Sequence, residues 1–356
     1  MNKLKAISLF AGIGVGEFYL DEIGINVIAA NEVEEKRCKI YKYFYPKTTV
    51  VCGDIRNQLI KEQIVSLALE NNVEILIATP PCQGMSTVGK NKSDKKLHSD
   101  DRNLLILETF EIIDRISPKY VLIENVPRFL KVRYSFEGLD LTIMDILKLK
   151  YGKAYQIEAD IFDTANFGIP QVRTRAFIRL YKKGLHWPQP KVEKEQITVE
   201  AAIGHLPSLE SAMVSDIKNH WARKHPDNQI EWMKSTPTGQ TAFNNKIKFP
   251  VNKEGNRIKG FKNCYRRIDW HKPAPTITMR NEIISSQNNV HPGRKIDDET
   301  WSDARVLSLR ELLILSSFPP DTELPQDVSD TSIRQLIGEG IPPKMIKKIL
   351  EGLNNA

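Results

Sequence analysis

Cys82 carries the clearest chemical signal in this sequence of 356 residues. It follows two prolines at the end of an apolar run, in the stretch IATPPCQGMS. Two prolines make a stiff turn, whereas a buried structural cysteine is better accommodated by pliable apolar surroundings. A thiolate at such a turn, near cationic residues, is a nucleophile. The sequence therefore predicts a reactive Cys82, and the alternative is an inert thiol in the core.

One acid and two arginines are the other candidates for chemistry. Glu124 directly follows an apolar run, where an acid is costly unless it has a function or a partner. A partly desolvated carboxyl can share a proton with a ring nitrogen, and an ion pair with an arginine is compatible with that role. Arg173 and Arg175 lie two apart on an expected strand and should project to one face. They indicate an acidic or carbonyl-bearing partner, or else a solvated strand edge.

Three further features indicate a bound small molecule. The glycine-rich stretch FAGIGVG, residues 10–16, lets the backbone approach a ligand closely because glycine has no Cβ. Glu32 suits a ribose diol, or is an acid near a helix N-terminus. Asp54 can accept a hydrogen bond from an adenine amino group, or belongs to a simple turn. Together they predict an adenosine-like ligand held without an obvious phosphate cradle.

The elements that position these residues alternate between strand and helix up to about residue 181. Such alternation is typical of a parallel sheet with crossover helices, whose ligands bind beyond the carboxyl ends of the strands. We therefore predict an α/β fold with a doubly wound, mostly parallel sheet. The expected strands are 6–10, 26–30, 48–52, 74–78, 120–124, 155–159 and 172–180, and the expected helices lie near 15–23, 33–44, 58–71, 102–116 and 138–150.

A second, irregular region follows Trp187, with scattered prolines and aromatics and weak periodicity. Within it, residues 211–280 hold 14 Lys and Arg against 5 Asp and Glu, a net charge of +9. Such an excess favours a polyanionic partner, to which we expect Arg266 and Arg267 to contribute, and a merely solvated lysine-rich surface is the alternative. Helical spacing returns near residue 305, which suggests a tail that packs back on the first domain.

The composition excludes several classes of protein. Lys3 and Lys5 before an apolar stretch resemble a secretory signal, but acids follow at once without a cleavage site. No run of about 18 apolar residues is present, so we expect no membrane span. Four scattered cysteines do not indicate a disulfide framework or a zinc site. We expect a protein of the reducing cytoplasm that uses no metal.

Taken in order, the motifs resemble those of the bacterial DNA (cytosine-5) methyltransferases of restriction-modification systems. FAGIG is similar to the first motif of that family, PPCQGMS to its nucleophile loop, ENV to its glutamate motif and QVRTR to its paired-arginine motif. LSLRELLILSSFP and GEGIP resemble the ninth and tenth motifs. The resemblance implies a Rossmann-like methyltransferase fold, S-adenosyl-L-methionine as cofactor and S-adenosyl-L-homocysteine as product.

The resemblance also implies a mechanism. Cys82 would attack C6 of a cytosine flipped out of double-stranded DNA, while Glu124 bonds to N3 and Arg175 holds O2, and C5 would then accept the methyl group. Arg173 would brace this site. Residues 84–102 resemble the loop that closes over DNA. The positions that match cofactor contacts of the family are Phe10, Gly12, Gly14, Glu32, Asp54 and Pro80.

By the same resemblance the chain has three parts: residues 1–185 for catalysis, 186–304 for target recognition and 305–356 as the C-terminal segment. It would act as a monomer in the bacterial cytoplasm, associated with the nucleoid, and have a possible cognate restriction endonuclease. Three departures from the family pattern weaken individual cofactor contacts. Val15 replaces a glycine, Glu339 and Gly340 alter the tenth motif, and DDRN lacks the usual glycine after its arginine.

Three alternative functions remain open on the sequence. A tRNA cytosine-5 methyltransferase shares the chemistry, but usually has a different setting for its cysteine and a shorter variable region. An amino-group methyltransferase stacks the base on an aromatic residue, whose position Cys82 occupies here. A catalytically silent DNA-binding relative fits the altered tenth motif, although Cys82, Glu124 and both arginines are intact.

Overall fold

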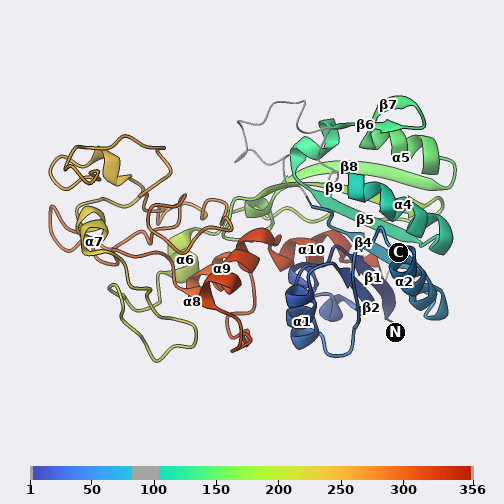
Figure 1. Cartoon of the computed structure of the whole chain (residues 1–356), viewed down its shortest axis with the longest axis horizontal. Helices are drawn as coiled ribbons and strands as arrows, with labels where there is room; N and C mark the ends of the chain where they lie inside the picture. Colours follow the sequence, from blue (N-terminus) through green and yellow to red (C-terminus); the bar gives the residue numbers. More distant parts are fainter. Residues whose placement is uncertain (1–2, 82–103, 354–356) are drawn as a thin grey trace. The chain divides into compact units, whose positions relative to one another are not determined.

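The computed structural model describes residues 3–81 and 104–353, which fall into two compact units. The first comprises Met1–Asp163, Thr174–Pro190 and Ile346–Ala356, and the second comprises Thr164–Arg173 and Lys191–Met345. The chain therefore enters and leaves each unit more than once, as the colours of Figure 1 show.

A seven-stranded sheet in the order β3-β2-β1-β4-β5-β9-β8 forms the first unit. Strands β1 to β5 are parallel, β9 runs antiparallel to β5, and β8 runs antiparallel to β9. The strand order reverses between β1 and β4, so the predicted doubly wound, mostly parallel sheet is confirmed. The strands are β1 (Leu4–Leu9), β2 (Ile25–Glu32), β3 (Thr49–Cys52), β4 (Ile75–Ala78), β5 (Tyr120–Asn125), β8 (Tyr155–Asp163) and β9 (Thr174–Lys182).

Helices cover the sheet because its central strands are apolar on both faces. Every residue of β4 is buried. Alternate residues of β1, β4 and β5 share one core cluster with residues of α2, α4 and α5, which places these three helices on one face. In the described part of residues 1–163, the α-helices are α1 (Glu35–Phe44), α2 (Gln58–Glu70), α4 (Leu105–Ile116) and α5 (Ile143–Tyr151).

Two local expectations differ from the structure. The helix expected near 15–23 consists of two short 3-10 helices, η1 (Val15–Glu17) and η2 (Asp21–Ile23). The helix expected near 138–150 begins only at Ile143, where Thr142 and Asp145 form a capping box. The residues before it form β7 (Leu139–Thr142), which pairs with β6 (Arg133–Phe136) in a hairpin that the sequence reading missed.

Cys38 and Cys52 form a disulfide, with their Cα atoms 6.0 Å apart. Four scattered cysteines in an expected reducing compartment did not predict this single disulfide. The reason is the crossover geometry: α1 carries Cys38 and packs beside β3, whose last residue is Cys52. Cys264 is a free thiol.

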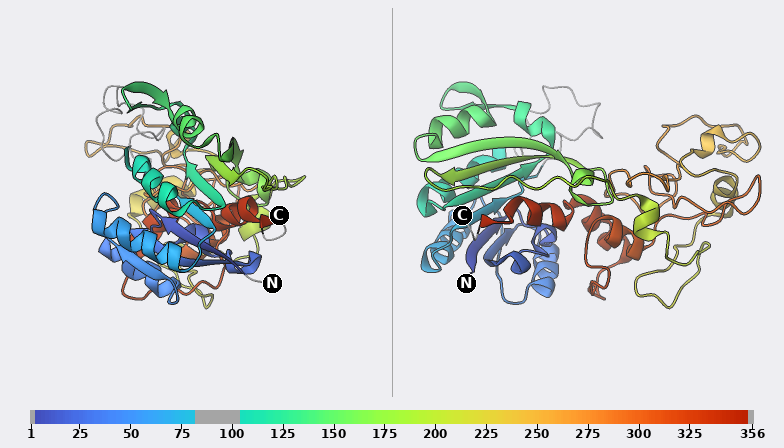
Figure 2. Two further views of the ribbon diagram at one scale, coloured as in Figure 1. Left: turned by 90° about the vertical axis from the view of Figure 1, so that its right-hand side faces the viewer. Right: turned by 180° about the vertical axis from the view of Figure 1, so that it is seen from behind.

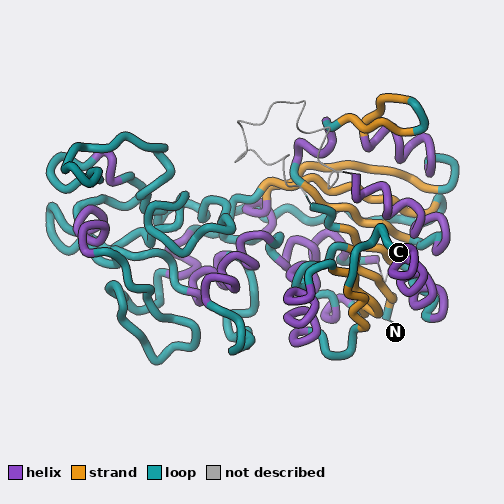
Figure 3. The backbone as a smooth tube through the Cα atoms, viewed as in Figure 1, coloured by secondary structure: helices purple, strands orange, loops and turns teal. Residues whose placement is uncertain are grey.

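The second unit contains little regular structure, as the extent of loop in Figure 3 shows. Its small core cluster gathers side chains from distant segments, including Trp232, Met233 and Val290. Helix α8 begins with a capping box between Ser308 and Glu311. The helices wholly within this unit are α6 (Val199–Ile203), α7 (Asp227–Lys234), α8 (Leu309–Leu315) and α9 (Asp330–Glu339).

Helix α10 (Pro343–Leu350) returns the chain to the first unit from Ile346 onward. Figure 2 shows this helix, in red, beside the blue N-terminal strands. Lys347 pairs with Glu22 at 2.6 Å, and Trp187 donates a hydrogen bond to the carbonyl of Ile349 at 2.7 Å. Within residues 3–81 and 104–353, no helix is long and apolar enough to cross a membrane.

Candidate active site and cofactor-binding residues

Glu124 and Arg175 lie together on neighbouring strands. The antiparallel register of β5 and β9 pairs Glu124 with Phe177, so Arg175 lies diagonally opposite Glu124 on the same face. Nε of Arg175 is 3.0 Å from a carboxylate oxygen of Glu124, and the two side chains are only 16% and 12% exposed. Such a charge-assisted contact fixes the direction of the carboxylate and of the guanidinium group.

Arg173 occupies a different setting, and the prediction that both arginines lie on one strand is wrong. The backbone N–H of Val172 donates to the carbonyl of Ala274, so strand β9 begins only at Thr174. Arg173 is buried in the second unit. Its guanidinium group donates to three main-chain carbonyls, those of Ile277 at 2.8 Å, Gly338 at 3.0 Å and Glu339 at 2.8 Å.

The segment that leads to Cys82 is anchored on both sides. The hydroxyl of Thr79 donates to the carbonyl of Phe10 at 3.0 Å. The side-chain amide of Asn125 donates to the carbonyl of Pro80, also at 3.0 Å. Asn125, whose contact with this turn was not predicted, thus links the end of β5 to it. Cys82 itself and the loop 84–102 lie outside the described residues.

The glycine-rich turn after β1 has three residues with a positive φ: Phe10 at 58°, Gly12 at 58° and Gly14 at 77°. A Cβ atom on Gly14 would lie 2.3 Å from the ring of Tyr45, so only glycine fits there. A Cβ on Gly12 would meet nothing within 4 Å, which leaves open space beside that residue. Val15 begins η1 without a positive φ, so the replacement of glycine there costs no strain.

Glu32 ends β2 with its carboxylate held by the backbone. One oxygen accepts from the N–H of Gly12, and the other accepts from the N–H groups of Val33 and Glu34, each at 2.9 Å. The side chain is buried. Because a carboxylate oxygen can accept two hydrogen bonds, the oxygen that faces Gly12 can take one more donor, such as a ribose hydroxyl.

Asp54 is oriented by Arg56, a partner that the sequence reading missed. The backbone N–H of Arg56 donates to the Asp54 carboxylate at 2.9 Å, and its guanidinium group donates at 3.0 Å. These hydrogen bonds lower the pKa of Asp54. A ligand amino group would therefore meet a charged carboxylate of fixed direction.

A buried acid, Glu17, lies below the glycine-rich turn and was also missed. Its carboxyl group accepts hydrogen bonds from Tyr41 and Ser8, and burial raises its pKa to about 7. Tyr45 donates to the carbonyl of Gly14 at 2.6 Å. Tyr41 of α1 and Tyr45, the residue after α1, therefore hold Glu17 and the turn in place. The one signal in the sequence was an acid placed between a glycine turn and the apolar residues that follow it.

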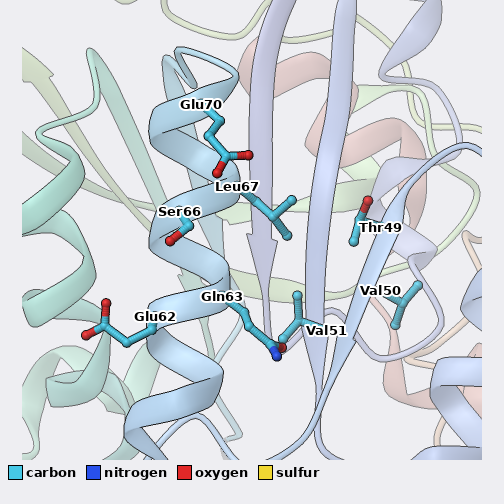
Figure 4. Close-up of a pocket in the computed structure, with 8 residues that line it drawn as sticks. All are labelled: Thr49, Val50, Val51, Glu62, Gln63, Ser66, Leu67 and Glu70. Carbon is cyan, nitrogen blue, oxygen red and sulfur yellow. The ribbon is translucent and has the colours of Figure 1, made fainter.

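Neither a further surface hollow nor a metal-binding cluster adds to this site in the described part of the chain. A surface hollow between β3 and α2 contains none of the predicted site residues (Figure 4). Within residues 3–81 and 104–353, no group of three or more His, Cys, Asp or Glu is placed to hold a metal ion. The hollow is lined by Thr49, Val50, Val51, Glu62, Gln63, Ser66, Leu67 and Glu70.

The charge of the second unit is divided between its interior and its surface. Arg267 is fully buried and donates to four carbonyls, so its assignment as a DNA contact is wrong. A guanidinium group inside a unit cannot reach a polyanion. The adjacent Arg266 is partly exposed. Exposed cations gather instead in residues 246–262.

Comparison with known proteins identifies the family. The C-5 cytosine-specific DNA methylase family matches residues 4–355. The chain belongs to this family. It is therefore a DNA (cytosine-5) methyltransferase with DNA as its substrate, as the ordered motifs predicted, and neither a tRNA enzyme nor a silent relative is favoured.

Relatives of this DNA methyltransferase match it from end to end. Type II methyltransferase M1.HgaI of Avibacterium volantium is 47% identical over 354 residues, which cover 99% of both chains. Type II methyltransferase M1.HphI of Haemophilus parahaemolyticus is 27% identical and covers 98% of this chain and 86% of its own.

Solved structures share the fold of this methyltransferase. A protein from an E. coli prophage, described as a DNA modification methyltransferase, has a TM-score of 0.72 at 20% identity over 99% of both chains. The methyltransferase EhMeth of Entamoeba histolytica has a TM-score of 0.67 at 17% identity, covering 100% of this chain and 99% of its own. The Rossmann-like methyltransferase fold is thereby confirmed.

Proposed function

We propose that this methyltransferase methylates C5 of a cytosine flipped out of duplex DNA, through a transient bond between Sγ of Cys82 and C6 of the base. The observation that supports this most is the buried pair of Glu124 and Arg175 at 3.0 Å. Asn125, next to Glu124, holds the Pro80 carbonyl two residues before Cys82. Two adjacent residues of β5 thus hold Arg175 and the segment before Cys82: Glu124 pairs with the arginine, and Asn125 bonds to Pro80.

The proposed roles follow from the charge that develops on the base. Attack of the Cys82 thiolate on C6 sends electrons toward N3 and O2 of the ring. Glu124, as an acid at N3, and Arg175, as a donor to O2, stabilise that charge and leave C5 nucleophilic. After methylation, loss of the C5 proton expels Cys82. Arg173 is a positioning residue in this scheme, since it holds the carbonyls of Ile277, Gly338 and Glu339.

The proposed cofactor is S-adenosyl-L-methionine, which supplies an electrophilic methyl group when bound and leaves as S-adenosyl-L-homocysteine. Glu32 would accept from a ribose hydroxyl, because one of its oxygens retains acceptor capacity. Asp54, oriented by Arg56, would accept from the adenine amino group. The turn from Phe10 through Gly12 and Gly14, together with Pro80, would line the rest of the site. No step of the proposed reaction uses a metal ion.

We assign catalysis to residues 1–185 and target recognition to 186–304, and we assign to the C-terminal segment 305–356 the role of packing back on the catalytic domain. The type II relatives favour a role in protecting host DNA beside a cognate restriction endonuclease. We expect a monomer in the bacterial cytoplasm, associated with the nucleoid because its substrate is there. The Cys38–Cys52 disulfide does not favour a reducing compartment, whereas the DNA substrate supports the cytoplasmic assignment.

The test begins with bisulfite sequencing of DNA from cells that express the chain, which gives the methylated site. A duplex with 5-fluorocytosine at that site should then form a covalent adduct with the protein when S-adenosyl-L-methionine is present, because fluorine cannot leave as a proton. Cys82→Ser should still bind the duplex and form no adduct. A wild-type chain that binds the duplex yet neither methylates nor forms an adduct would contradict the proposal.

A further inference from the structure

An exposed basic loop, residues 246–262, stands out on the second unit. It contains six Lys or Arg residues and one acid, a net charge of +5. All six cationic side chains belong to exposed residues, and Lys248 pairs with Glu231 at 3.1 Å. The cationic residues of the basic loop are Lys246, Lys248, Lys253, Arg257, Lys259 and Lys262.

Specific contacts hold the two arms of the basic loop in place. The guanidinium group of Arg257 lies 4.1 Å from the ring centroid of Phe249 and donates to the carbonyl of Asn245 at 2.9 Å. Gly260 lies so close to Phe243 that a Cβ atom would be 2.4 Å from its ring. The backbone on the N-terminal side of Phe261 is therefore held against the body of the unit.

The side chain of Phe261 itself is largely open to solvent. It is 80% exposed, the highest value among the large apolar side chains of the described residues. Lys259 and Lys262 flank it and are also exposed. An exposed aromatic ring gains free energy when a partner covers it. Its position in a cationic loop favours a partner that offers both negative charge and flat apolar surfaces.

We infer that Phe261 enters the DNA duplex as an apolar wedge between adjacent base pairs, while Lys259 and Lys262 contact phosphates. The inference rests on the proposed function, because the partner is the DNA substrate. Duplex DNA provides phosphate charge at its surface and stacked base faces at an opened step, where apolar side chains can insert. Local unstacking near the target also lowers the cost of extruding the cytosine. Phe261 is thus a positioning residue that does not touch the reacting atoms.

A second copy of the chain is a less suitable partner for this surface. Two basic loops of net charge +5 would repel each other where they met. DNA instead attracts the basic loop, because its phosphates are negatively charged and lysines that contact them release condensed counterions. Charge complementarity therefore favours the nucleic acid.

The experiment uses the full chain and a duplex with the site found by bisulfite sequencing, with 2-aminopurine placed at successive positions through it. Binding is measured over a range of salt concentrations. The fluorescence of 2-aminopurine rises when the base is unstacked, so the wild type should increase it at one base step. Phe261→Ala should abolish this increase, and should weaken binding by at least about tenfold with an unchanged salt slope. Phe261→Trp should retain both properties because it keeps a flat apolar ring.

Two matched variants separate the wedge from charge and from apolar surface in general. Lys259→Gln combined with Lys262→Gln should lower the slope of log binding constant against log salt concentration by about 2, and should keep the increase in 2-aminopurine fluorescence. Val214→Ala removes an apolar side chain that is 75% exposed in the same unit but outside the basic loop. This variant should bind and unstack DNA as the wild type does.

The possible failures are distinguishable. If Phe261→Ala binds and unstacks DNA like a methylating wild type, the wedge is refuted and the proposed function stands. If sedimentation shows that Phe261 drives self-association and leaves DNA binding unchanged, a second copy is the partner and the wedge is likewise refuted. If the wild type neither methylates nor traps 5-fluorocytosine, the proposed function fails whatever Phe261 does.

Discussion

The two units satisfy their buried main-chain carbonyls by different means. In the first unit, neighbouring strands pair along a continuous sheet. In the second unit, most of the chain is loop, and buried arginines donate to carbonyls that no strand reaches. Arg267 alone donates to the carbonyls of Met233, His291, Ser302 and Asp303. Side-chain donors thus replace the backbone hydrogen bonds that paired strands would provide.

This difference changes how the charge of the second unit is interpreted. Arg173, Arg305 and Arg334 are also buried and also donate to main-chain carbonyls. Arg305 in addition pairs with Asp303 and Glu311 at distances of 2.8 to 2.9 Å. A net positive charge in the sequence therefore has two parts, an interior part that supports the fold and an exposed part that is available to DNA.

The largest expected effect comes from breaking this interior network. Arg267→Met should lower the free energy of unfolding by about 4 kcal/mol, because it removes a buried network of hydrogen bonds and takes the Arg267 donors from the carbonyls of His291 and Ser302. Urea denaturation measures the change. Arg266→Met, next to it and partly exposed, should change the free energy by no more than about 0.5 kcal/mol. Equal stabilities of the two variants would show that arginine donors are not what holds the second unit together.

The sequence could not separate these two arginines, although it predicted much of the first unit. The apolar runs placed strands β1 to β5 within two residues of their bounds, because the central strands of the sheet are buried on both faces. Arg266 and Arg267 are adjacent and chemically identical. Their burial depends on segments far along the chain, such as those of His291 and Asp303.

The candidate site was predictable to a similar degree. Glu32 and Glu124 were found because each is an acid at the end of an apolar strand. The roles of Asn125 and Glu17 were missed because these roles depend on their partners, the Pro80 carbonyl and the Tyr41 hydroxyl. Neither partner is indicated by a local pattern. The role of Cys82 stays a prediction.

The next effect belongs to the first unit, where a covalent link joins α1 to β3. The combined Cys38→Ser and Cys52→Ser variant should lose about 3 kcal/mol of stability, because a closed loop of this size restricts the unfolded chain. Reduction of the wild type should produce the same loss, as read from urea denaturation with and without dithiothreitol. If dithiothreitol leaves the stability of the wild type unchanged, Cys38 and Cys52 are not oxidised in solution.

Rising pH should weaken the first unit through Glu17. Its pKa is about 7 in the folded protein and near 4.5 when unfolded, so the folded state keeps a proton that the unfolded state releases. Stability from this group is complete below pH 4.5 and falls by about 3 kcal/mol as the pH rises to 7. Glu17→Gln should remove the dependence. A parallel pH profile for wild type and variant would contradict the assignment of the buried proton.

Falling pH should weaken the second unit, and this is the smallest effect. Burial lowers the pKa of His291 to about 3, well below its value of 6.5 in the unfolded chain. Below pH 6.5 the unfolded state therefore binds a proton that the folded state does not bind. This difference lowers the free energy of unfolding by about 2 kcal/mol at pH 5. Nearby Asp303 and Glu311 oppose the shift, while Arg305 and Arg267 favour it. His291→Gln, made in a Glu17→Gln background where the opposite effect of Glu17 is absent, should reduce the loss of stability between pH 7 and 5 by about 2 kcal/mol. Glu17→Gln alone is the matched control, because it leaves this acid-side loss in place. The two units would then respond to pH with opposite sign, because one buries an acid and the other buries a base.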